Sequence, residues 1–140
     1  MKIWATAARS ISGNYKMASI LLAEDDTAMR GFLKAALEKN GHTVHAAQDG
    51  AEALSYLDKG GRYELLLTDI VMPNMDGLEL SLHARKIAPT MPVMFITGFA
   101  GLAAEDNPAN TQIISKPFNL KDIVDEVNKI LANNRLQNDG

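Results

Sequence analysis

The sequence contains no cysteine, so the chain can form neither a disulfide bond nor a thiolate metal site. No apolar run approaches the roughly 20 residues that a membrane-spanning helix needs. Positive charge is also scarce, with 14 lysines and arginines against 17 acidic residues and a formal net charge of −3. Nucleic-acid binding needs clustered basic residues. We therefore expect a cytoplasmic protein that binds neither nucleic acid nor membranes.

The 140 residues, 46% of them hydrophobic, have the length of one compact domain. Residues 1–16 contain no acidic residue and no sustained apolar segment, so they make a poor secretory signal. We interpret them as an extension that is flexible or derived from cloning, with a partner-binding amphipathic arm as the alternative. The domain itself should span residues 17–133, and the polar residues 134–140 should form a disordered tail.

Five short apolar segments alternate with segments of helical periodicity. Four of the five have continuous apolar centres, which is typical of strands buried on both faces in a parallel sheet. The alternation predicts an α/β protein, a doubly wound (βα)5 fold around a five-stranded parallel sheet. The expected strands are residues 19–23, 43–47, 64–68, 93–97 and 111–115.

Apolar residues recur at helical spacing in four of the segments between and after the strands. The first helix should end before Gly41, and in the third helix we expect Leu78 and Leu82 to face the core. Residues 98–111 are rich in Gly, Ala, Asn and Pro, so a fourth helix there should be short or irregular. The other three apolar stripes are Met29, Phe32, Leu33, Ala36 and Leu37; Ala51, Leu54 and Leu57; and Leu120, Ile123, Val124, Val127 and Leu131.

Polar side chains stand at the carboxyl ends of four of the expected strands. Glu24 and Asp25 end the first strand, Asp69 ends the third, Thr97 ends the fourth, and Lys116 follows the fifth. The carboxyl ends of parallel strands meet at one edge of the sheet, where open α/β sheets bind their ligands. These five side chains should therefore converge.

Crowded carboxylates repel one another unless a hard cation lies among them, and Mg²⁺ prefers carboxylate, carbonyl, water and phosphate oxygens. A cation, the Lys116 ammonium and the Thr97 hydroxyl together could neutralise a phosphoryl group arriving at a carboxylate nucleophile. Asp69 is the best candidate nucleophile, because it is the one acid placed singly at the end of a buried strand. The purely structural alternative is that the acidic run favours a helix N-terminus, with Asp26 or Thr27 as the cap.

The runs ILLAEDD, LLLTDIVMPNMDGLEL, MFITG and ISKPF occur in this order and resemble the receiver domain of response regulators. The similarity covers about residues 18–132. It implies a flavodoxin-like and CheY-like sheet of strand order 2-1-3-4-5. It also implies a phosphoacceptor signalling protein, with no enzymatic activity beyond its own phosphotransfer and dephosphorylation. The implied phosphodonor is a histidine kinase or a histidine phosphotransferase.

The same resemblance implies a role for each matching residue. Asp69 would be the phosphoacceptor, and Mg²⁺, or Mn²⁺ in its place, would be the cofactor. The metal ligands would be Glu24, Asp25, Asp69 and the backbone carbonyl of Val71. The phosphoryl-binding and switch residues would be Thr97, Gly98 and Lys116. A cis bond would precede Pro117, Gly77 would make the turn into the third helix, and the donor-docking residues would be Ala28, Met29, Phe118 and Asn119.

The longer runs ELLLTDIVMP, MFITGFA and SKPF further resemble stand-alone receivers that control substrate delivery to the ClpXP protease in the alphaproteobacterial cell cycle. This likeness implies output by protein–protein contact, with ClpX as the candidate partner, and we expect a monomer. A phosphate sink and a binding module that is never phosphorylated are the alternatives.

Two features depart from the receiver pattern. The fifth strand carries Ile113 and Ile114 where many receivers have a switching aromatic residue, and the segment from Thr97 to Lys116 is about one helical turn shorter. Signalling through ordering of residues 98–110 is the hypothesis that these departures suggest.

Two other protein classes share parts of this pattern. A flavin-binding flavodoxin needs a phosphate loop after the first strand, and the acidic AEDD run does not suit one. An aspartyl-phosphate hydrolase commonly needs a second acid two residues after the nucleophile, where this chain has Val71.

Overall fold

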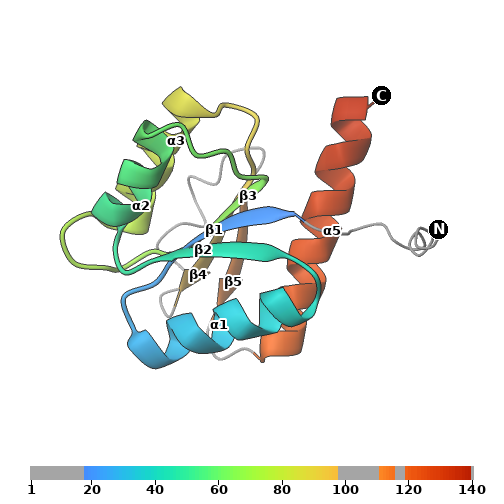
Figure 1. Ribbon diagram of the computed structural model, residues 1–140, viewed down its shortest axis with the longest axis horizontal. Helices are drawn as coiled ribbons and strands as arrows, with labels where there is room; N and C mark the ends of the chain where they lie inside the picture. Colours follow the sequence, from blue (N-terminus) through green and yellow to red (C-terminus); the bar gives the residue numbers. More distant parts are fainter. Residues whose placement is uncertain (1–17, 98–110, 116–118, 140) are drawn as a thin grey trace.

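The computed structural model describes residues 18–97, 111–115 and 119–139, which form one sheet with helices on both faces (Figure 1). All strands are parallel and lie in the order β2-β1-β3-β4-β5. The predicted sheet is therefore confirmed, and only the third strand differs, beginning one residue later so that it includes Asp69. The strands are β1 Ser19–Ala23, β2 Thr43–Ala47, β3 Leu65–Asp69, β4 Val93–Thr97 and β5 Thr111–Ser115.

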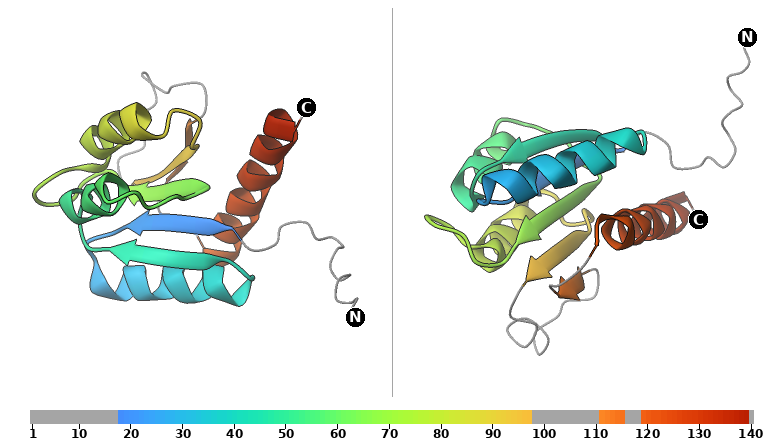
Figure 2. Two further views of the ribbon diagram at one scale, coloured as in Figure 1. Left: turned by 45° about the horizontal axis from the view of Figure 1, so that its top comes forward. Right: turned by 90° about the horizontal axis from the view of Figure 1, so that it is seen from below.

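Within the described residues, two helices cover each face of the sheet (Figure 2). Helices α1 (Thr27–Lys39) and α5 (Leu120–Asp139) share one apolar core, while α2 (Gly50–Asp58) and α3 (Gly77–Ile87) share the other. The expected fourth helix falls in residues 98–110, outside the described residues. No helix in the described ranges is both long and apolar enough to cross a bilayer.

Strand β3 lies between the two cores and explains why its sequence is apolar without alternation. Successive strand side chains point to opposite faces, so Leu65 and Leu67 enter the α1–α5 core while Leu66 enters the α2–α3 core. All five residues of β3 are buried, including Asp69 at its carboxyl end. A charged group is thus held at the end of a fully buried strand.

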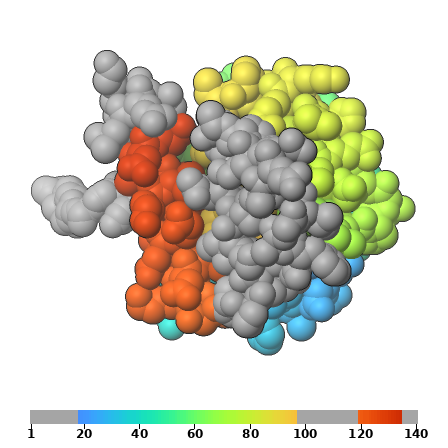
Figure 3. Space-filling model, turned by 180° about the vertical axis from the view of Figure 1, so that it is seen from behind, coloured from blue at the N-terminus to red at the C-terminus, as the bar shows by residue number. Residues whose placement is uncertain are grey.

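The predicted inward faces of two helices need correction. Leu33 and Leu37 of α1 are buried, but Phe32 is 59% exposed. In α3, Leu82 is 62% exposed and Leu78 is also exposed, on a helix that forms part of the surface in Figure 3. The buried face of α3 consists instead of Gly77, Leu80, Ser81 and Ala84, a mostly small stripe that permits close packing on the sheet.

The His42 side chain is buried. Its Nδ1 accepts a hydrogen bond from the Ala18 backbone N–H at 3.4 Å, and its Nε2 lies 2.7 Å from Asn128 Oδ1. Because Nδ1 accepts, the hydrogen must be on Nε2, which donates to Asn128. The imidazole therefore joins the start of β1 to helix α5.

The polar tail was expected to be disordered, but helix α5 continues through Asp139. Neither proline nor glycine occurs between Leu120 and Asp139 to stop it. At the other end of the helix, the Asn119 side chain accepts from the Asp122 backbone N–H at 2.8 Å and acts as the cap.

Candidate functional site

Three carboxylates meet at the carboxyl edge of the sheet, on the left in Figure 1, where β1 leads into α1. Glu24 and Asp25 follow β1, and Asp69 ends β3. These two strands pair directly, with Ala23 in register with Thr68. One carboxylate oxygen from each acid can be chosen so that all three atoms lie within 4.8 Å of one another. The pairing of β1 with β3 therefore assembles an acidic cluster from distant parts of the chain.

The three acids differ in their access to solvent. Glu24 is 0% exposed and Asp69 is 6% exposed, while Asp25 is open to water. Two buried carboxylates beside a third repel one another strongly unless positive charge compensates them. All-oxygen donors with an open side fit a hard divalent cation that keeps some of its water. The donor set thus suits Mg²⁺ or Mn²⁺.

The turn from β1 to α1 is fixed by hydrogen bonds around the acids. Glu24 Oε2 accepts from the Asp26 backbone N–H at 3.0 Å. Asp26 is the N-cap of α1, since its Oδ1 accepts from the Met29 N–H at 2.8 Å. The alternative interpretation of the acidic run, an acid that caps the helix, therefore holds for Asp26. Arg30 Nη1 donates to the carbonyls of Glu24 at 2.9 Å and Asp25 at 3.4 Å. Sequence analysis did not single out Arg30.

The β3–α3 loop, residues 70–76, closes tightly onto the end of β3. The Gly77 N–H donates to the Ile70 carbonyl at 2.7 Å. A Cβ atom at Gly77 would collide with the backbone carbonyl oxygen of Asp69. Glycine is therefore required here by close backbone approach, which is the reason for the Asp-Gly pair in the sequence.

A buried carboxylate outside the cluster anchors the same loop. Asp49 is the N-cap of α2, and its Oδ1 accepts from the Glu52 backbone N–H at 2.8 Å. Its Oδ2 accepts from Asn74 Nδ2, also at 2.8 Å. These two bonds lower the pKa of the Asp49 carboxyl below its ordinary value of 3.8, with the Glu52 bond the larger cause. Sequence analysis missed Asp49, although an aspartate directly before a helix start is a capping signal.

The depressed pKa of Asp49 predicts acid sensitivity. Its bonds stabilise the fold above the pKa of the unfolded carboxyl, and this contribution is lost as the pH falls through the lower folded-state pKa. Any excess of wild type over Asp49→Asn in free energy of unfolding at pH 7 depends on the ionised Asp49 carboxyl, so we expect this difference to shrink below about pH 4. Urea unfolding of both proteins at several pH values measures this difference. A stability difference that does not change with pH would contradict this expectation.

The remaining expected site residues fall into two groups. Among the described ones, Thr97 ends β4, and the residue before it, Ile96, is in register with Asp69. Val71 is exposed in the β3–α3 loop. Ala28 is exposed and Met29 is half-buried in the first turn of α1, and Asn119 is exposed at the start of α5. Those outside the described residues are Gly98, Lys116, Pro117 and Phe118.

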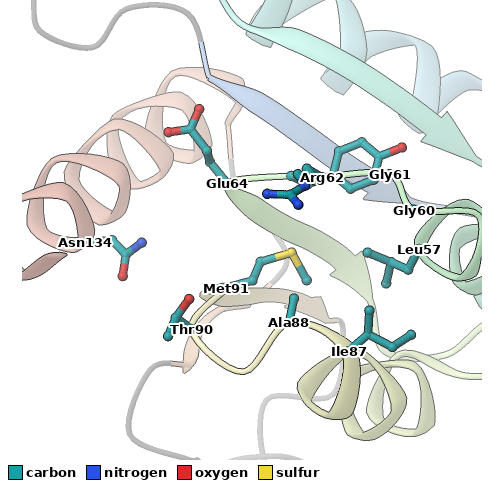
Figure 4. Close-up of a pocket in the computed structure, with 11 residues that line it drawn as sticks. Leu57, Gly60, Gly61, Arg62, Glu64, Ile87, Ala88, Thr90, Met91 and Asn134 are labelled. Carbon is teal, nitrogen blue, oxygen red and sulfur yellow. The ribbon is translucent and has the colours of Figure 1, made fainter.

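A cavity of about 730 Å³ lies at the opposite edge of the sheet (Figure 4). Arg62 and Glu64 line it from the connection into β3, Thr90 and Met91 from the connection into β4, and Asn134 from α5. These connections precede their strands, whereas the acidic cluster follows β1 and β3. The cavity is therefore separate from the cluster.

Comparison with known proteins agrees with this geometry. The response regulator receiver domain model matches residues 20–128. The response regulator receiver protein CpdR of Brucella abortus is 50% identical over 118 residues, which cover 82% of this chain and 98% of that protein.

Solved structures show the same likeness. A response regulator receiver protein from Sinorhizobium medicae superposes with a TM-score of 0.79 at 30% identity, covering 84% of this chain and 97% of that one. The response regulator TrrA of Thermotoga maritima, in complex with Mg²⁺-BeF, has a TM-score of 0.72 at 29% identity, covering 81% and 99%. With its strand order, its acidic edge and these relatives, the chain belongs to the response regulator receiver domain family.

Proposed function

We propose that this chain accepts a phosphoryl group on Asp69 from a phosphohistidine, with Mg²⁺ as the cofactor. The observation that carries the proposal is the acidic cluster, in which Asp69 lies at the end of a buried strand beside Glu24 and Asp25. The Mg²⁺-BeF complex of the similar protein TrrA supports the choice of cation. The donor would be a histidine kinase or a histidine phosphotransferase.

The residues of the site divide the work of phosphotransfer. A carboxylate oxygen of Asp69 attacks phosphorus, an O–P bond forms, and the bond from phosphorus to the donor histidine nitrogen breaks. Glu24, Asp25, Asp69 and the Val71 carbonyl would hold the cation, which supplies positive charge to the phosphoryl oxygens. The buried wall formed by Glu24 and Asp69 leaves the exposed Asp25 side for the donor to approach.

The phosphoryl group also needs donors from the protein itself. We assign this role to the Thr97 hydroxyl, the Gly98 backbone and the Lys116 ammonium. Thr97 ends β4, and Gly98 and Lys116 directly follow β4 and β5, which run parallel to β3. A docking surface of Ala28, Met29, Phe118 and Asn119 would then present the histidine donor to Asp69.

Phosphorylation by a small donor tests the proposal. With Mg²⁺ and an acyl phosphate, we expect one phosphoryl group per chain, stable in acid and labile in base. The adduct should not form when the cation is chelated, because the crowded carboxylates then repel the incoming phosphate. Absence of an adduct in the presence of Mg²⁺ would refute the assignment.

We further propose that output is contact with another protein, with ClpX as the partner and delivery of ClpXP substrates as the result. The 50% identity to CpdR over nearly all of that protein supports this assignment. We expect immobilised unphosphorylated protein to retain ClpX, and the beryllofluoride-treated protein to retain less. Equal retention by both forms would favour a binding module without a switch, and no retention would favour a phosphate sink.

A further inference from the structure

The β3–α3 loop contains Val71, whose carbonyl would complete the cation site. The Gly77 contacts with Ile70 and Asp69 fix the loop where it enters α3. The middle of the loop is fixed differently, by a hydrogen bond between the side chains of Asn74 and Asp49. The second attachment joins the loop to α2, an element that contributes nothing to the acidic cluster.

The acceptor of this bond is itself held by burial and by a second hydrogen bond. Asp49 is buried, and its other carboxylate oxygen accepts from the Glu52 N–H at the first turn of α2. Helix α2 is held in turn by Ala53 and Leu57, which are buried in the core shared with α3. The Asn74 amide is therefore attached to a buried and well-packed part of the molecule.

The backbone of the loop is tightly turned at Asn74. Asn74 has a φ of 70°, the left-handed conformation that asparagine tolerates better than most residues. The Met75 N–H donates to the Pro73 carbonyl at 2.8 Å, which makes a tight turn. A Cβ atom at Gly50 would collide with the Met75 carbonyl oxygen, so the turn packs directly on the start of α2. Such a backbone persists where its surroundings over-determine it.

We propose that Asn74 is a positioning residue for the cation, and that its bond to Asp49 holds the β3–α3 loop so that the Val71 carbonyl faces the acidic cluster. This inference rests on the proposed function of the site. Mg²⁺ demands near-ideal octahedral geometry with short bonds, so a loop that moves by a few tenths of an ångström loses affinity. Groups that orient metal ligands typically change metal affinity by about 10- to 100-fold when removed.

The test compares Mg²⁺ affinity in three proteins. Asn74→Gly removes the amide but accepts the positive φ without strain. Asn40→Gly is the matched control, since Asn40 also donates a side-chain amide hydrogen bond, in its case to the Ala36 carbonyl at the far end of α1. We expect Asn74→Gly to raise the Mg²⁺ dissociation constant about tenfold in titration calorimetry, and Asn40→Gly to leave it unchanged.

A second readout separates positioning from general destabilisation. At saturating Mg²⁺, Asn74→Gly should be phosphorylated by an acyl phosphate at nearly the wild-type rate, because the cation restores the loop. Asp49→Asn keeps an oxygen for the Asn74 amide and should give a smaller loss of affinity. If Asn74→Gly does not fold, the Mg²⁺ affinity of Asp49→Asn is measured instead.

The outcomes distinguish the two claims. If the Mg²⁺ dissociation constant of Asn74→Gly is within twofold of wild type, the positioning role is overturned and the phosphoacceptor assignment stands. If Asn74→Gly does not fold, an unchanged dissociation constant in Asp49→Asn has the same meaning. A wild-type protein that neither binds Mg²⁺ nor forms an adduct overturns both.

Discussion

The Asp69→Asn variant is expected to form no phosphoryl adduct under conditions that label wild-type protein completely. Asparagine has nearly the shape of aspartate but lacks the anionic oxygen that attacks phosphorus. Among the three clustered acids, Asp69 alone ends a fully buried strand. Quantifying the acid-stable, base-labile adduct by mass spectrometry would measure the loss.

The control for this variant is Asp26→Asn. Asp26 lies beside the cluster in sequence but caps α1 in the structure, and asparagine caps a helix as well as aspartate does. We therefore expect Asp26→Asn to be labelled like wild type. An adduct that persists in Asp69→Asn would place the nucleophile on another residue and refute the assignment.

The Gly77→Ala substitution is expected to have the largest effect on stability. Its Cβ would collide with the backbone carbonyl oxygen of Asp69, and a backbone atom cannot rotate away as a side chain can. Either the β3–α3 loop or the end of β3 must then move. We expect the free energy of unfolding to fall by about 3 kcal/mol, measured by denaturant unfolding.

Gly31→Ala provides the matched comparison. Gly31 lies inside α1, and a Cβ there would meet no atom within 4 Å. Alanine is the better helix former, so Gly31→Ala should raise the free energy of unfolding by about 0.5–1 kcal/mol. If both substitutions have the same effect, the close approach at Gly77 does not control stability.

The elements and the nucleophile candidate could be predicted because their signals are local. Continuous apolar runs mark strands buried on both faces, and four of the five strands were predicted with the observed bounds. The parallel order then places the ends of β1 and β3 side by side, so an acid at the end of each strand is enough to predict a cluster.

The inward face of α3 and the supporting bonds could not be predicted because they depend on contacts between distant segments. Leu78 and Leu82 have the spacing of a buried pair, yet the small stripe of α3 packs on the sheet. His42 finds its partner, Asn128, in the last helix. The bond from Asn74 to Asp49 likewise joins two turns that no local pattern connects.

The pairing of β1 with β3 also makes the acidic cluster depend on folding of the sheet. Glu24 and Asp69 meet only when these two strands are side by side, and parallel pairing is among the slower steps of folding because it joins distant segments. A nascent chain that still lacks β3 has two of the three clustered acids and lacks Asp69, the proposed phosphoacceptor. Under the proposed function, phosphorylation of Asp69 therefore requires that this part of the sheet has formed.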